Sequence, residues 1–265
     1  MVFSSHIFVF YFLPFALIAY YAAPRVLRMP VLTLASYAFY GWTNPWFILL
    51  ILWSTIVDFC CGNLIYGHWR LLGPVTLGPN GEPRASERQR KVFLVVSLLS
   101  NVGMLCFFKY FMFAEENVNA LLAALGQREF NILVVLLPAG ISFYTFESIS
   151  YNVDIYFGRA KPAAVWIQRL AAASGVRTLT GWGKLKQEAR ALNAFACYIT
   201  QFPHLVAGPI IRYQDMERQL HERTHTWDLS KNVNPWRAAW AMGLLGWALV
   251  ALSTQTFNPF LYFQF

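Results

Sequence analysis

The sequence predicts an all-α, polytopic integral membrane protein with about four to six transmembrane helices plus re-entrant or half-length helices. Of its 265 residues, 57% are hydrophobic and 13% are charged, roughly half the charged share of a typical soluble domain. Long apolar runs recur along the chain, and the basic residues lie between them, as they do in the cytoplasmic loops of membrane proteins. That placement accounts for the net charge of +8. No nucleic-acid-binding motif accompanies the charge, so we expect no nucleic acid partner.

Four apolar stretches precede the middle of the chain. Residues 46–65 and 92–113 reach the roughly 20 helical residues that a bilayer crossing needs. Residues 7–22 are shorter and contain Pro14, which predicts a kinked first span. Residues 31–42 suit a half-helix. A loop is expected to follow the fourth stretch, at 114–131.

Residues 132–158 form the stretch around which the prediction is organised. The run is long enough to span a bilayer, yet its second half is rich in hydroxyls and carries Glu147 and Asp154. A carboxylate within a spanning helix costs on the order of 2.5–3.5 kcal/mol. We therefore expect this helix to face protein or a water-filled cavity. Asp58 lies inside another predicted span, and an ion pair with Lys109 is one way to compensate it.

Basic residues also give an orientation. The loops at 66–91 and 158–191 carry five and seven of them and are predicted to be cytoplasmic, which places the N-terminus outside. Residues 192–211 break the alternation, because a further basic run follows them. They also contain Pro203 and Pro209, which interrupt a helix. A re-entrant hairpin is favoured over a full crossing, and both remain open.

The predicted site lies on one face of the central helix. Glu147, Ser150, Tyr151 and Asp154 are spaced i, i+3, i+4 and i+7, so they share a helical face. They form either the polar wall of a substrate channel or a polar seam bonded to neighbouring helices. Tyr144 is assigned to the same channel wall.

Two further candidates lie later in the chain. Arg212 follows the Gly208-Pro209 break and is either a contact for a donor phosphate or an ordinary interfacial cation. His204 is a catalytic candidate, against the plainer reading of a structural histidine bonded to a freed backbone carbonyl. The four cysteines lie in apolar runs without the spacing of metal ligands, so no metal site is predicted.

Three stretches together resemble the membrane-bound O-acyltransferase family, in the branch that acetylates exopolysaccharides such as alginate. The opening MVFSS with its Phe-rich continuation resembles the N-terminus of that branch. Residues 140–151, GISFYTFESISY, are similar to its most recognisable early motif, and 202–213, FPHLVAGPIIRY, are similar to a third block. The order and spacing of these fragments carry the match.

The resemblance covers residues 1–228, which we interpret as the N-terminal part of the family's membrane domain. Within residues 1–228, the stretch 164–190 resembles an inserted cytoplasmic loop or short amphipathic helix. Residues 229–265, beyond the resemblance, form a divergent apolar tail. The family implies a catalytic His that acts as general base in a Leu-Trp-His-Gly setting. No such motif exists in this sequence, so we expect the chain to be inactive alone.

What the resemblance implies is acetyl transfer from a cytoplasmic donor such as acetyl-CoA, which is a substrate and not a resident cofactor, toward a polysaccharide hydroxyl. It also implies membrane lipids, extracytoplasmic polysaccharide-acetylation proteins and the polysaccharide acceptor as partners, in the bacterial inner membrane. The alternative is a non-catalytic scaffold or transporter-like subunit, because broken helices with buried acids also build transporter sites.

Overall fold

The computed structural model describes most of the chain up to residue 222, in the ranges 5–24, 26–42, 44–77, 83–125, 140–173, 181–202 and 212–222, with 127, 138, 236, 240 and 243 as single positions. Within these ranges every regular element is a helix except one hairpin of two-residue strands, β1 (Thr76–Leu77) and β2 (Pro83–Arg84). The predicted all-α architecture is confirmed for them. The helices are η1 (Phe8–Phe12), α1 (Leu13–Ala22), α2 (Arg28–Gly41), α3 (Phe47–Tyr66), α4 (Glu87–Ala124), α5 (Ile141–Tyr156), α6 (Ala163–Ala173), α7 (Gly181–Thr200) and α9 (Tyr213–Glu222).

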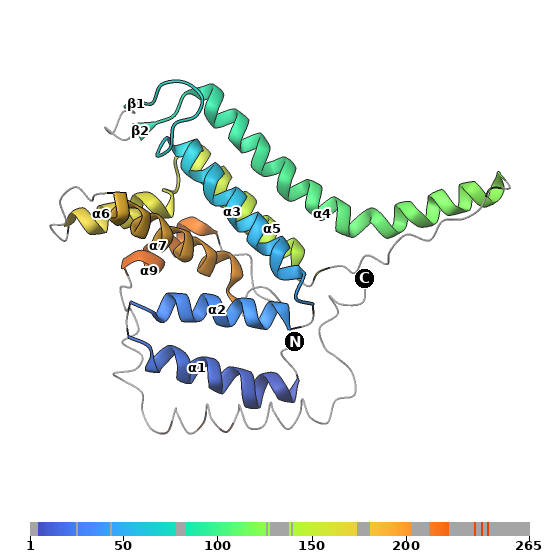
Figure 1. Ribbon diagram of the computed structural model, residues 1–265, viewed down its shortest axis with the longest axis horizontal. Helices are drawn as coiled ribbons and strands as arrows, with labels where there is room; N and C mark the ends of the chain where they lie inside the picture. The colour runs from blue at the N-terminus through green and yellow to red at the C-terminus, as the bar shows by residue number, and fades with distance from the viewer. Residues whose placement is uncertain are drawn as a thin grey trace.

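Three helices make the centre of the molecule. α3, α4 and α5 pack against one another, and α7 contacts α3 and α5 from a second side (Figure 1). α1 packs on α2, which in turn packs on α7. α6 and α9 complete the group around α7. The predicted site residues of α5 therefore lie on the most enclosed helix of the group.

Two helices are long and apolar enough to cross a membrane, α3 and α4. α3 has 20 residues, which is about 30 Å of helix and matches a hydrocarbon core. It ends at Tyr66 and is capped by Gly67, whose φ of 98° is a left-handed conformation that a residue with a side chain rarely adopts. These two helices match the predicted stretches 46–65 and 92–113. The count of four to six spans stays a prediction.

The predicted loop at 114–131 is wrong over its first part, because α4 continues to Ala124 and has 38 residues. Residues 114–124 contain alanine, leucine and glutamate, which favour helix, and neither glycine nor proline interrupts them. The second half of α4 extends away from the other helices (Figure 1). The predicted span therefore covers only the middle of a much longer helix.

The central stretch is shorter as a helix than predicted. α5 begins at Ile141, directly after Gly140 with φ 78°, and has 16 residues. Residues 132–137, which the prediction added to it, lie outside the described part of the chain. A continuous helix over 132–158 is wrong, because the described positions Pro138 and Gly140 are not helical.

The predicted inserted loop at 164–190 contains α6 and the first half of α7, so the amphipathic-helix reading is the one the structure supports. The second half of α7 is buried from Ala194 to Thr200. Residues 203–211 of the predicted hairpin, and nearly all of 229–265, lie outside the described residues.

Pro14 lies near the start of the N-terminal helix, and the kink expected there stays a prediction. The five residues of η1 form a π-helical turn directly before α1, in which Pro14 occupies the first turn. This places Phe8 against Phe39 and Phe202, with ring centroids 5.5 and 6.1 Å away. The N-terminal helix is thereby joined to α2 and to the end of α7.

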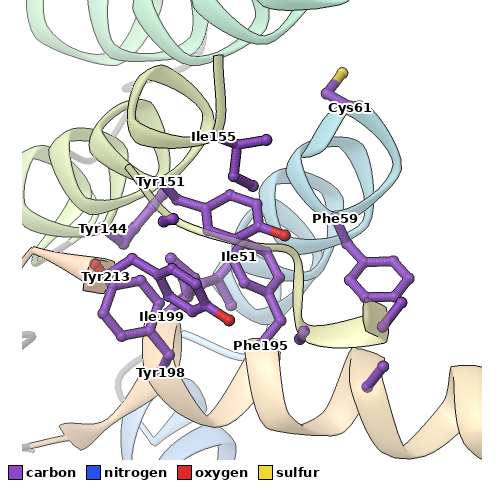
Figure 2. Packing of buried hydrophobic residues seen from close by; sticks show 14 of the residues in the cluster. Ile51, Phe59, Cys61, Tyr144, Tyr151, Ile155, Phe195, Tyr198, Ile199 and Tyr213 are labelled. Carbon is purple, nitrogen blue, oxygen red and sulfur yellow. The ribbon is translucent and has the colours of Figure 1, made fainter. Parts of the chain in front are cut away.

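An aromatic core joins α3, α5, α7 and α9 (Figure 2). Tyr151 lies at its centre, with its ring centroid 4.3 Å from that of Phe195 and 4.7 Å from that of Tyr213. Tyr198 packs edge-on against Tyr213 at 5.2 Å. Buried aromatic pairs of this kind each contribute about 0.5–1.5 kcal/mol beyond their burial. The core fixes the rotation of α5 and so decides which of its residues point outward.

Candidate functional site

A buried polar network surrounds Asp58, halfway along α3. Ser97 donates a hydrogen bond of 2.6 Å to Oδ1 of Asp58, and the amide of Asn152 donates to the same oxygen at 2.9 Å. The amide of Asn101 lies 2.9 Å from both carboxylate oxygens. Ser54 contacts Oδ2 at 3.2 Å. The donors come from α3, α4 and α5, so this carboxylate joins the three central helices.

Asp58 is thus compensated by hydrogen bonds. Among the described residues it forms no ion pair, and Lys109 is exposed over the ring of Tyr110, 5.9 Å from its centroid. The pairing of Asp58 with Lys109 is therefore wrong. Hydroxyl and amide donors satisfy a buried carboxylate without the cost of burying a second charge.

The four predicted residues of α5 do not share one environment. Glu147, Tyr151 and Asp154 are buried, with exposed fractions of 1%, 0% and 3%. Ser150 is half-buried. Tyr144 is fully buried and has its ring edge-on to Tyr40, at 6.3 Å. Their role as a substrate channel stays a prediction.

One open pocket of about 470 Å³ lies on the outer side of α5. Its apolar wall is formed by Phe146, Ile149 and Val153. Its polar lining comprises the predicted residues Ser150, Asp154 and Arg212, together with Arg159. Three of the predicted channel residues therefore meet at one place, and Arg159 is the residue that sequence reasoning missed there.

The charges of the pocket favour an anion. Arg159 and Arg212 supply two guanidinium groups, and Asp154, the one acid among the described lining residues, is almost completely buried. The backbone carbonyl of Asp154 accepts hydrogen bonds from the amides of Arg159 and Ala160, at 2.8 and 3.3 Å. That turn fixes Arg159 beside the end of α5. Planar guanidinium groups bind phosphate and carboxylate oxygens in pairs.

His68 is a described histidine that contacts other polar side chains. Its Nε2 lies 2.8 Å from Oε1 of Glu188 on α7 and 3.4 Å from the amide of Gln168 on α6. This contact fastens α6 and α7 to the end of α3. His204, the catalytic candidate, lies outside the described residues. Within the described ranges no group of three His, Cys, Asp or Glu side chains could hold a metal ion.

A sequence signal for the Asp58 network existed. Three apolar helices each carry a polar pair spaced by four residues, so that both members lie on one helical face: Ser54 with Asp58, Ser97 with Asn101, and Ser148 with Asn152. Ser148 completes the group, with its Oγ 3.5 Å from that of Ser54. Polar residues on one face of an apolar helix predict a contact between helices.

Spanning-length apolar helices joined by a buried polar network are typical of a polytopic membrane protein, and comparisons with known proteins give the family. The chain is 34% identical over 229 residues to the probable alginate O-acetylase AlgI of Pseudomonas aeruginosa, covering 86% of this chain and 36% of that protein. It is 35% identical over 228 residues to the protein of the same name from Azotobacter vinelandii, covering 38% of it. A peptidoglycan O-acetyltransferase of Helicobacter pylori is 24% identical over 98% of this chain and 46% of that protein. No protein-family model and no solved structure matches.

The resemblance seen in the sequence is thereby confirmed: over 86% of its length the chain is a homologue of proteins named alginate O-acetylases, which are acetyltransferases of the membrane-bound O-acyltransferase type. It spans little more than a third of the length of these relatives.

Proposed function

We propose that this chain forms part of a membrane O-acetyltransferase that transfers acetyl groups from a cytoplasmic donor such as acetyl-CoA toward hydroxyls of an exopolysaccharide such as alginate. The observation that carries the proposal is the 34–35% identity to alginate O-acetylases over 86% of the chain. Polysaccharide, lipids and extracytoplasmic acetylation proteins are the partners this function requires. The proposed location is the bacterial inner membrane, crossed several times, with the N-terminus outside.

Within this function the pocket on α5 is the proposed donor site. Arg159 and Arg212 would bind the phosphates of the donor, while Phe146 and Ile149 would contact its apolar part. Ser150 and Asp154 belong to the polar lining together with the two arginines. Two phosphate-binding arginines beside an apolar wall are what a nucleotide-linked thioester needs.

Acetyl transfer also requires a general base for the acceptor hydroxyl and a donor to the thioester oxygen. Among the described residues that line the pocket there is no histidine. On the family resemblance the base is a histidine in a Leu-Trp-His-Gly setting, a motif that this sequence does not contain. We therefore propose that the chain alone binds the donor without transferring its acetyl group.

Two measurements on the purified full chain test this proposal. Binding of a non-reactive thioether analogue of acetyl-CoA is expected, and Arg159→Gln with Arg212→Gln should weaken it about tenfold or more, because charge-assisted hydrogen bonds contribute about 1.5–3 kcal/mol. Arg84→Gln is the matched control, since Arg84 is exposed and is not one of the described residues that line the pocket. A labelled acetyl donor should show no turnover with this chain.

The alternative is a scaffold or transporter-like subunit. The Asp58 network favours it, because a buried acid where apolar helices meet is also a feature of transporter sites. This alternative function predicts that the chain does not bind the thioether analogue. A chimera separates the two functions further, in which this chain replaces the matching region of an alginate O-acetylase. Restored polysaccharide acetylation supports the proposal, and a folded but inactive chimera that fails to bind the analogue contradicts it.

A further inference from the structure

The first half of α7 carries an unusual outward face. Trp182, Leu185, Lys186 and Arg190 are spaced i, i+3, i+4 and i+8, so they lie on one side of the helix. Trp182 is 71% exposed and Leu185 is 58% exposed. An exposed tryptophan and leucine on the face that points away from the protein form a small apolar patch. Two cations border that patch.

The opposite side of the same turns is attached to the protein. Glu188 contacts His68 at 2.8 Å, and Ala191 is fully buried. The helix is therefore held in one rotation, and the apolar patch faces outward as a consequence of packing. An ordinary water-facing helix would present polar residues there.

The cations of this patch are available to bind an anion. Among the described residues, Lys186 and Arg190 form no ion pair with an acidic side chain. The acid within reach on this half of the helix, Glu188, lies on the inner side and is engaged by His68. Nothing in the described part of the chain neutralises the outward charge.

The position of the patch along the membrane normal follows from the same contact. His68 lies two residues beyond Tyr66, the last residue of α3, and α3 has the length of a hydrocarbon core. Glu188, one turn from Leu185, is therefore at the depth where a spanning α3 reaches the membrane surface. Tryptophan, leucine and basic residues together at that depth are typical of a helix in the headgroup region.

We propose that the outward face of α7 binds the surface of an anionic phospholipid membrane, with Trp182 and Leu185 inserted at the acyl boundary and Lys186 and Arg190 on the lipid phosphates. This surface is distinct from the pocket on α5, and the proposal does not depend on acetyl transfer. Its consequence is that α6 and α7 are oriented by the lipid as well as by His68. Attraction of basic residues to anionic lipid makes the contact dependent on lipid composition.

The test places a spin label at the centre of the patch. Ala189 is exposed on the same face of the helix. The substitution Ala189→Cys leaves Trp182, Leu185 and the two bordering cations unchanged. Cys60 and Cys106, the half-buried and exposed cysteines, are replaced by serine. The full chain is reconstituted in vesicles of phosphatidylcholine alone or mixed with phosphatidylglycerol. Accessibility of the label to oxygen and to a water-soluble nickel reagent then reports its depth.

In the mixed vesicles the label should be accessible to oxygen and protected from nickel. Lys186→Gln with Arg190→Gln should shift the ratio of inserted to water-exposed label by roughly tenfold or more. Each basic residue near an anionic surface strengthens membrane binding roughly fivefold, and this variant removes two. Lys184→Gln, which removes an exposed cation from the other side of the helix, should leave the ratio unchanged.

Three results overturn the proposal. Full access to nickel in both vesicles means that the face lies in water. Protection from both reagents means that protein covers it. Insertion that is equal in both vesicles and unaffected by the double variant means that the cations do not bind lipid phosphate. The circular dichroism of each variant must match that of the parent chain, so that a misfolded protein is recognised.

Discussion

Ser97 on α4 donates a 2.6 Å hydrogen bond to the carboxylate of Asp58 on α3, and both residues are fully buried. Asn152 contacts both of them, at 2.9 Å to Asp58 and 2.9 Å to Ser97. The three central helices therefore meet at one satisfied polar point. This point lies near the middle of α3, where water cannot replace a lost partner.

Asp58→Ala should be among the most damaging substitutions in the chain. It removes the acceptor that Ser97, Asn101 and Asn152 share, although the two amides keep contacts with Ser97. A buried donor that loses its partner costs about 1–3 kcal/mol, so the loss of this shared acceptor should cost about 2 kcal/mol or more. Asp58→Asn keeps the shape and one acceptor oxygen, so its cost should be clearly smaller. Thermal unfolding in detergent measures both. Equal stability of Asp58→Ala and the parent chain would contradict the role of the network.

The network also shows which parts of the structure can be predicted from the sequence. The spacing of Ser54 with Asp58, and of Ser97 with Asn101, predicts polar helix faces from the sequence alone. Which faces meet depends on how the helices pack, and no local pattern encodes that. The extent of α4 was missed for another reason, since the prediction ended the helix where hydrophobicity fell, although helix-forming residues continue to Ala124.

The candidate site was predictable to a similar degree. The helical face with Ser150 and Asp154 followed from periodicity, and both line the pocket. Tyr151 shares the face and is instead packed under Phe195 in the aromatic core. Arg159 was missed because it lies beyond the end of α5, in a turn whose direction is set by hydrogen bonds to the carbonyl of Asp154.

Gly62→Ala should destabilise the contact between α3 and α5. A methyl group at Gly62 would lie 2.6 Å from Cε1 of Tyr151, and Tyr151 is held on its other side by Phe195. Overpacking of this kind costs about 1–3 kcal/mol. Gly103→Ala is the matched control, because a methyl group at Gly103 on α4 meets nothing within 4 Å. That control should gain up to about 1 kcal/mol of helix propensity. Thermal unfolding that moves both variants in the same direction would refute the close approach.

Gln89 should prove essential for the connection between α3 and α4. Its amide donates to the carbonyls of Leu64 and Trp69, at 2.7 and 3.0 Å, and its carbonyl accepts from the backbone of Leu71 and Leu72. Gln89→Ala and Gln89→Glu should each cost about 2 kcal/mol or more, since buried backbone groups lose partners.

Acidic pH separates the two Gln89 variants. In Gln89→Glu a carboxylate oxygen faces the carbonyls of Leu64 and Trp69, and a protonated carboxyl can donate to one of them. The stability deficit of Gln89→Glu relative to the parent should therefore shrink as the pH is lowered, whereas that of Gln89→Ala should stay constant. Arg88→Ala, exposed at the adjacent position, should change stability by less than about 0.5 kcal/mol.

Glu217 on α9 makes the stability of the α6–α9 contact dependent on pH. Its carboxylate accepts hydrogen bonds from the indole of Trp166 and from the backbone amide of Lys161. Burial raises the pKa of Glu217 above its ordinary 4.5, and these two hydrogen bonds offset the rise in part. Because the folded-state pKa is the higher one, the stability that Glu217 contributes is fully present below its ordinary pKa and is lost as the pH rises through the folded-state value.

Glu217→Gln should remove that dependence. A glutamine keeps the oxygen that accepts from Trp166 and Lys161 and carries no charge to desolvate, so the variant should equal or exceed the parent in stability at neutral pH. Glu217→Ala loses both hydrogen bonds and should be less stable at every pH. Melting temperatures recorded on both sides of the ordinary pKa test this, with Asp215→Asn as the control, since Asp215 is an exposed acid on the same helix. A parent chain that grows more stable relative to Glu217→Gln as the pH rises would show that the carboxylate is favoured by its hydrogen bonds more than it is penalised by burial.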